Sequence, residues 1–104
     1  MSVLKGILRE EEKRLKALSR MYRSELRKLP KGSISLKKIR NGKYAYLAYR
    51  DGKRVRFDYL GNASSEAVKR LHVQIRERRK VESLMSQASE NLREVERMIR
   101  GSKA

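Results

Sequence analysis

The chain has 104 residues, and its 28 Lys and Arg outnumber its 12 Asp and Glu, which gives a formal net charge of +16. A chain of this length predicts a single domain over residues 1–104, and the absence of cysteine excludes disulfides and thiolate metal sites. No apolar run approaches the roughly 20 residues of a membrane-spanning helix, and Glu10, Glu11 and Glu12 stand where a signal peptide would be apolar, so we expect a cytoplasmic protein without a membrane partner.

Residues 3–29 predict a first long helix. Apolar side chains recur there at helical heptad spacing, although Glu11 and Glu25 interrupt the stripe. Pro30 and Gly32 predict its end. The stripe consists of Leu4, Leu8, Leu15, Leu18, Tyr22 and Leu29.

Residues 33–60 predict a three-stranded antiparallel β-meander. Asn41-Gly42 and Asp51-Gly52 are strong signals for two-residue type I′ hairpin turns, because glycine and asparagine tolerate the positive φ that these turns need. The expected strands are residues 33–40, 43–50 and 53–60.

The second turn predicts which side chains share a face of the sheet. If Arg50 lies opposite Lys53, one face is apolar and aromatic and the other carries Leu47, Tyr49, Arg54 and Arg56. We expect the helices to cover the aromatic face, which makes its tyrosines core residues, and we expect the basic face to meet water or a ligand. The aromatic face then contains Tyr44, Tyr46, Ala48, Val55, Phe57 and Tyr59.

The register of the first strand stays open. A strict two-residue turn would place Ile39 on the aromatic face but leave Ile34 and Leu36 on the basic face. A bulge or a longer turn is therefore the alternative.

Residues 64–100 predict a second long helix, which begins with a capping hydroxyl and a first-turn carboxylate in Ser64-Ser65-Glu66. The expected fold class is α+β: an antiparallel, coiled-coil-like helical hairpin whose two long helices are connected by the β-meander. A homodimer through the C-terminal part of the long helix is an open alternative. The predicted stripe of this helix contains Leu71, Gln74, Arg78, Val81, Met85, Ala88, Leu92, Val95 and Ile99.

The positive charge is concentrated in the middle of the chain. Residues 13–80 hold 22 bases and 5 acids, a net charge of +17, and should gather at the sheet end of the hairpin. Such a basic head favours nucleic acid, with duplex DNA expected over RNA, because Lys and Arg on phosphates release counterions. For the block at 76–80, a solvated helix face is an equal alternative. The candidate contacts are Lys38, Arg40, Lys43, Tyr49, Arg50, Lys53, Arg54, Arg56, Arg76, Arg79 and Lys80.

Two resemblances accompany these patterns. The Tyr49-Arg50-Asp51-Gly52-Lys53-Arg54 string, Leu60-Gly61 and Ser65-Glu66-Ala67 resemble the arm-type DNA-binding domain of tyrosine-recombinase integrases over residues 41–68, which implies DNA-facing roles for Arg54 and Arg56. Gly32-Ser33, Tyr44 to Tyr49 and Gly52 to Leu60 resemble a family of small uncharacterised bacterial and archaeal proteins with the order helix, Tyr-rich hairpin, helix. Many of its members have cysteines that this chain lacks, so no metal role carries over.

The residues do not predict an enzyme. His72 is the only histidine, and no nucleophile with a base, phosphate-cradling glycine loop or metal cluster is evident, so we expect neither catalytic residues nor a cofactor. The competing hypothesis is a protein-interaction adaptor or antitoxin-like module whose basic surface binds an acidic protein.

Overall fold

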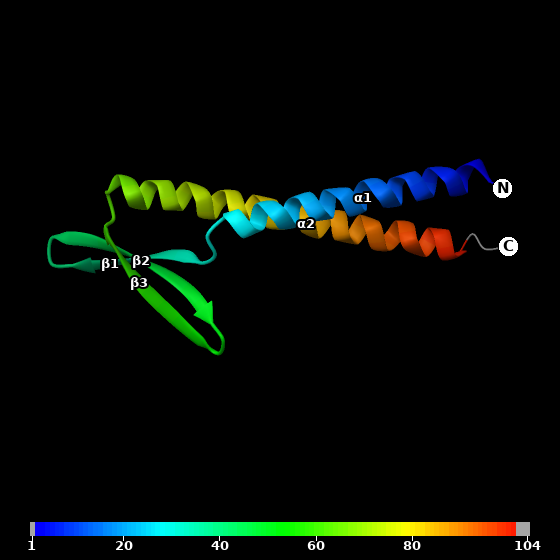
Figure 1. Cartoon of the computed structure of the whole chain (residues 1–104). Helices are drawn as coiled ribbons and strands as arrows, with labels where there is room; N and C mark the ends of the chain where they lie inside the picture. Colours follow the sequence, from blue (N-terminus) through cyan, green and yellow to red (C-terminus); the bar gives the residue numbers. More distant parts are fainter. Residues whose placement is uncertain (1, 102–104) are drawn as a thin grey trace. The chain divides into compact units, whose positions relative to one another are not determined.

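The computed structural model describes residues 2–101, and the element order is helix, three strands, helix (Figure 1). The helices are α1 (Val3–Lys28) and α2 (Glu66–Gly101), and the strands are β1 (Ser33–Ile39), β2 (Gly42–Asp51) and β3 (Arg54–Asn62). The strands form one antiparallel sheet in the order β1-β2-β3. The α+β fold class is therefore confirmed, and each element lies within two residues of its predicted bounds.

The chain divides into two compact units. One unit consists of residues 1–28 and 80–104, which contain α1 and the C-terminal part of α2. The other consists of residues 29–79, which contain the sheet and the N-terminal part of α2, and is called the sheet unit below.

The first unit is an antiparallel helix pair. Leu8 and Leu15 of α1 are buried in one cluster with residues of α2, and the partly buried Leu18 and Tyr22 pack against that cluster. Leu4, which belongs to the predicted stripe, is instead 59% exposed. The residues that α2 contributes to this core are Ala88, Val95 and Ile99, with Leu92 partly buried beside them.

Local hydrogen bonds fix where α2 begins. The Asn62 side-chain oxygen accepts hydrogen bonds from the backbone N–H and the hydroxyl of Ser64, at 2.9 and 2.7 Å. The hydroxyl of Ser65 then accepts one from the backbone N–H of Val68, at 3.3 Å. Ser65 therefore caps the helix, because its side chain accepts from a first-turn N–H that has no partner within the helix.

The buried stripe of α2 changes phase near Arg78. The predicted seam placed Gln74 on the buried side, but Gln74 is exposed and Ile75 is buried. Val68 is also buried, and Leu71 is half-buried, so the N-terminal part of α2 carries its own apolar stripe. Arg78 donates a hydrogen bond of 2.7 Å to the carbonyl oxygen of Leu29, which ties α2 to the segment before the sheet.

Both hairpin turns lie one residue away from their predicted places. The first turn is Arg40-Asn41, with Ile39 paired to Gly42, and the second is Gly52-Lys53, with Asp51 paired to Arg54. In each turn only the first central residue has positive φ, 56° for Arg40 and 64° for Gly52, which is the φ pattern of a type II′ turn. The prediction of two type I′ turns was wrong, and β2 gains one residue at each end.

Each register differs from the predicted one by two residues. Side chains alternate between the two faces of a strand, so a shift of two changes the cross-strand pairs but leaves every residue on its predicted face. Ala48 pairs with Phe57 and Tyr46 with Tyr59, so the six residues of the aromatic face lie together as expected. Ile34 and Leu36 lie on the opposite face, which we call the Ala45 face. A register irregularity occurs between β2 and β3 at Ala45 and Tyr46, not in β1 where a bulge had been considered.

The β3 side of the aromatic face is exposed, and the prediction that the helices would cover this face was wrong. Ala45 is completely buried, while Val55, Phe57 and Tyr59 of the aromatic face are more than half exposed. Ala45 pairs with Gly61, so the buried part of this face lies where the side chains of the sheet are smallest.

The backbone at Gly32 lies very close to strand β2. A Cβ at this residue would lie 2.5 Å from the carbonyl oxygen of Ala48 and 3.1 Å from a methyl carbon of Leu47. Its φ of 118° lies in a region that other residues rarely adopt. The connection between α1 and β1 therefore runs directly against β2.

Candidate nucleic-acid interface

The candidate cations of the sheet lie in two groups at opposite ends of β2. The first-turn cations are Lys38, Arg40 and Lys43, and the second-turn cations are Arg50, Lys53, Arg54 and Arg56. All of these residues are exposed. Figure 1 shows the two hairpin tips pointing in different directions from the body of the sheet.

The shifted registers separate residues that were expected to touch. Tyr49, Arg54 and Arg56 were expected to form a compact basic and aromatic surface, with Lys38 beside them if the first strand kept its register. Lys38 instead pairs with Lys43, whereas Arg56 pairs with Tyr49. The two pairs are separated by a rise of six residues along β2, which corresponds to about 20 Å. Tyr49, Arg54 and Arg56 therefore share one face as predicted, but Lys38 does not join them, and the cations of the sheet form two basic ends.

Two carboxylates, those of Asp51 and Asp58, lie on the Ala45 face together with Arg54 and Arg56. Asp51 forms an ion pair with Arg56, with 2.7 Å between the carboxylate oxygen and Nε, and Asp51 also pairs across the hairpin with Arg54. Both partners of the ion pair are more than half exposed, so the pair contributes little to stability and can exchange for a phosphate.

Tyr49 is also engaged. A hydrogen bond from its hydroxyl to the carboxylate of Asp58 raises the pKa of Tyr49, because the bond requires the protonated phenol. This half-buried residue is therefore fixed within the sheet, where the sequence had placed it as an available ligand contact.

On α2, the candidate residues Arg76, Arg79 and Lys80 are exposed. Their neighbour Arg78 is half-buried and bonds to the Leu29 carbonyl oxygen, so it serves the fold. The spacing of three and four residues places Arg76, Arg79 and Lys80 on one side of the helix.

The aromatic face is the feature that the sequence alone assigned to the core. Phe57 is 53% and Tyr59 61% exposed. Tyr59 lies beside the half-buried Tyr44 and Tyr46, and Phe57 pairs with Ala48 on the same face. The small pair Ala45–Gly61 was the available signal for the face that is buried instead.

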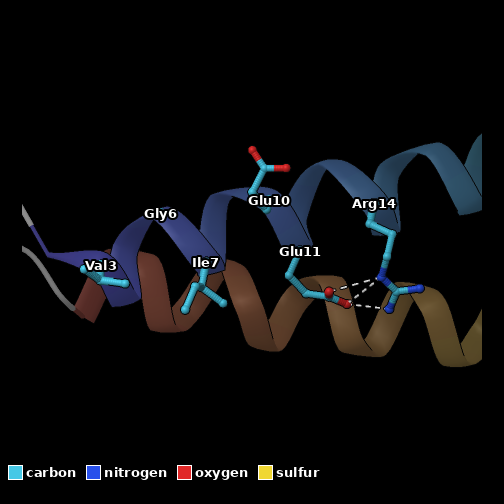
Figure 2. Close-up of a pocket in the computed structure, with 6 residues that line it drawn as sticks. All are labelled: Val3, Gly6, Ile7, Glu10, Glu11 and Arg14. Carbon is cyan, nitrogen blue, oxygen red and sulfur yellow. Dashed lines mark hydrogen bonds and ion pairs between the residues drawn. The ribbon is translucent and has the colours of Figure 1, made fainter.

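A shallow hollow on α1 offers a different kind of surface (Figure 2). Arg14 donates hydrogen bonds of 3.1 Å to both carboxylate oxygens of Glu11, and these bonds hold the pKa of Glu11 below its usual value. The carboxylates of Glu10 and Glu11, which line this hollow, would repel a polyanion. The hollow is lined by Val3, Gly6, Ile7, Glu10, Glu11 and Arg14.

Neither a metal centre nor a membrane span is found in the part of the chain that the structure describes. Among residues 2–101, no group of three or more His, Cys, Asp or Glu is placed to hold a metal ion. No helix within the same range is long and apolar enough to cross a membrane.

The fold and the two basic ends define a small helix–meander–helix protein. Residues 3–70 match the family described as "Domain of unknown function (DUF6788)", and the chain belongs to this family. The match covers α1, the whole sheet and the first turn of α2. Neither a curated protein nor a solved structure matches the chain.

Proposed function

We propose that the protein is a non-enzymatic nucleic-acid-binding protein whose sheet unit contacts the phosphate backbone of DNA. The observation that supports this most is the charge of the sheet unit. Residues 29–79 hold 14 Lys and Arg against 4 Asp and Glu, a net charge of +10. A polyanion relieves the mutual repulsion of these cations, and each phosphate contact gains affinity through counterion release.

The second-turn cations are the best candidates for duplex contacts. Lys53 lies in the turn itself, Arg50 and Arg54 lie in the strands next to it, and Arg56 lies two residues further along β3. A β-ribbon of this kind fits the major groove of B-DNA, where arginine can also contact guanine. The resemblance to arm-type integrase domains supports DNA in particular.

A double variant of the second-turn cations tests the proposal. We expect Arg54→Ala with Arg56→Ala to weaken binding of a mixed-sequence DNA duplex. Its salt dependence should also flatten, by about 0.9 in log–log slope for each phosphate that is no longer neutralised. Fluorescence anisotropy measures the affinity, and circular dichroism checks that the helicity is unchanged.

The matched control removes the same charge elsewhere. Arg93→Ala with Arg97→Ala also deletes two exposed arginines, but in the segment 81–104, which holds four bases and four acids. We expect this control to bind duplex almost as well as the wild type. Equal affinity of both double variants would reject the second turn as the site.

The same assay separates the competing function. A basic adaptor for an acidic protein would show little affinity for duplex at any salt concentration, whereas the proposed function requires measurable binding at low salt. The proposal includes a cytoplasmic location and leaves open a homodimer through the C-terminal part of α2.

A further inference from the structure

The aromatic face is an exposed apolar surface in the middle of a highly charged chain. Phe57 and Tyr59 are more than half exposed on β3, and Val55 beside them is 54% exposed. On β2, the neighbouring Tyr44 and Tyr46 are half-buried. Exposed side chains of this size, gathered on one face, mark a site that binds another molecule.

Three tyrosine rings form one cluster, and Lys37 connects this cluster to the ring of Phe57. The ring centroid of Tyr59 lies 5.4 Å from that of Tyr46 and 6.4 Å from that of Tyr44, with the planes tilted by 57° and 43°. The ammonium of Lys37, on β1, lies 5.1 Å from the Tyr46 centroid and 5.8 Å from the Phe57 centroid. A cation therefore already lies over the rings.

The two faces of the sheet differ in their charged side chains. Asp51 and Asp58 are the only acids of the sheet residues 33–62, and both lie on the Ala45 face. The aromatic face carries Lys37 and Arg50 with no carboxylate from these residues. Ring faces and cations without acids complement a ligand that has both flat apolar groups and negative charge.

A single nucleic-acid strand has this chemistry. Its unpaired bases expose their faces for stacking on aromatic side chains, and its phosphates follow the cations. In a duplex the base faces are buried against one another, so only the backbone and the groove edges are available. A second copy of this chain is disfavoured as the occupant, because its sheet unit would bring a like charge of +10 to the contact.

We infer that the aromatic face binds a single-stranded segment of DNA, with bases stacked on Phe57 and Tyr59 and phosphates held by Lys37 and Arg50. This inference rests on the proposed function and adds a second ligand form and a second face of the sheet to it. Stacking and phosphate contacts need no 2′-hydroxyl, so the face suits the same polymer that the second-turn cations contact.

Two matched double variants test the role of the rings. Tyr59→Leu with Phe57→Leu keeps apolar side chains but removes both rings, and Tyr59→Phe with Phe57→Tyr keeps both rings and the overall composition. Neither pair changes the charge. The probes are a fluorescently labelled thymidine oligonucleotide of about 12 nucleotides, within the usual site sizes of sheet-based single-strand binders, and a duplex and an RNA strand of equal length.

We expect the leucine pair to bind the single strand at least about fivefold more weakly than the wild type, since stacking contributes about 1–3 kcal/mol per base. Duplex affinity should stay within about twofold, and the ring-keeping pair should resemble the wild type for both probes. Lys37→Gln gives a second readout that leaves the rings intact, and it should also weaken single-strand binding.

Several outcomes would overturn the inference. Unchanged single-strand affinity in the leucine pair would remove the rings from the site, and tighter binding of the RNA strand would overturn the assignment to DNA. A wild type that binds duplex but not the single strand would overturn the inference and leave the proposed function standing, whereas a wild type that binds neither would reject both. If sedimentation showed that the leucine pair loses a dimer while single-strand affinity is unchanged, a second copy would be the occupant.

Discussion

Gly32 and Gly6 illustrate how differently two glycines in neighbouring segments are constrained. Gly32 has a φ of 118° and lies against the backbone of β2, whereas a Cβ at Gly6, inside α1, would meet no atom within 4 Å. The first glycine is required by the fold, and the second costs helix stability because its flexible backbone must be ordered.

Alanine substitutions at these two residues should therefore have opposite effects. We expect Gly32→Ala to lower the free energy of unfolding by more than about 1 kcal/mol, from backbone strain and the contact with the Ala48 carbonyl oxygen. Gly6→Ala should raise it by about 0.5–1 kcal/mol. Urea unfolding followed by circular dichroism measures both, and equal effects would contradict the placement of the connection against β2.

Gly42 explains why the sequence signal for the first turn was misleading. An Asn-Gly pair normally occupies the centre of a type I′ turn, but here Gly42 lies in β2 and the ring of Tyr44 lies over it. A Cβ at this residue would be 2.9 Å from the Tyr44 hydroxyl oxygen. The glycine therefore makes room for a side chain on the aromatic face, which a two-residue pattern cannot reveal.

At the level of the elements, the helices, strands and their order followed from periodicity and turn residues. The covered face of the sheet did not, because large aromatic side chains were taken to indicate the core. The sheet is instead buried where its side chains are smallest, at the pair Ala45–Gly61. The shift of both turns was also inaccessible, since each turn alone was compatible with two registers.

The N-terminal part of α2 should therefore stabilise the sheet through its own stripe. Ile75 is 4% exposed and Val73, two residues earlier, is 63% exposed. We expect Ile75→Ala to lower the free energy of unfolding by about 2–4 kcal/mol, as for other large-to-small core changes, and Val73→Ala to change it by less than about 0.5 kcal/mol.

Thermal or urea unfolding distinguishes this packing from the predicted seam, in which Gln74 faced the core. A larger loss of stability from Gln74→Ala than from Ile75→Ala would contradict the observed helix phase.

At the level of the whole molecule, the sequence located the charge but not its division between units. The predicted head of residues 13–80 included most of α1, whereas residues 13–28 lie in the helix-pair unit. The sheet unit ends at Arg79 and alone carries 14 of the 28 basic residues. A role for the α1 cations in binding stays a prediction.

For the candidate site, the sequence predicted the element on which most cations lie but not how the cations are grouped. Each cation was placed correctly on its strand or helix except Arg40 and Lys53, which lie in the two turns. The alternation of side chains along a strand was enough to predict the face of each strand residue. Their grouping depended on long-range register, which is set by which residues enter the turns. The residues of the aromatic face were predicted to lie together, but their exposure depends on tertiary packing, which the sequence pattern does not show.

The proposed function requires the sheet unit to contact several phosphates at once, and the salt dependence of wild-type binding tests this most directly. The ligand is a mixed-sequence DNA duplex, and the salt concentration runs between about 50 and 200 mM. We predict that the logarithm of the association constant falls with the logarithm of the salt concentration with a slope of about −3 or steeper. A slope near zero, or no measurable binding at the lowest salt concentration, would contradict the proposal.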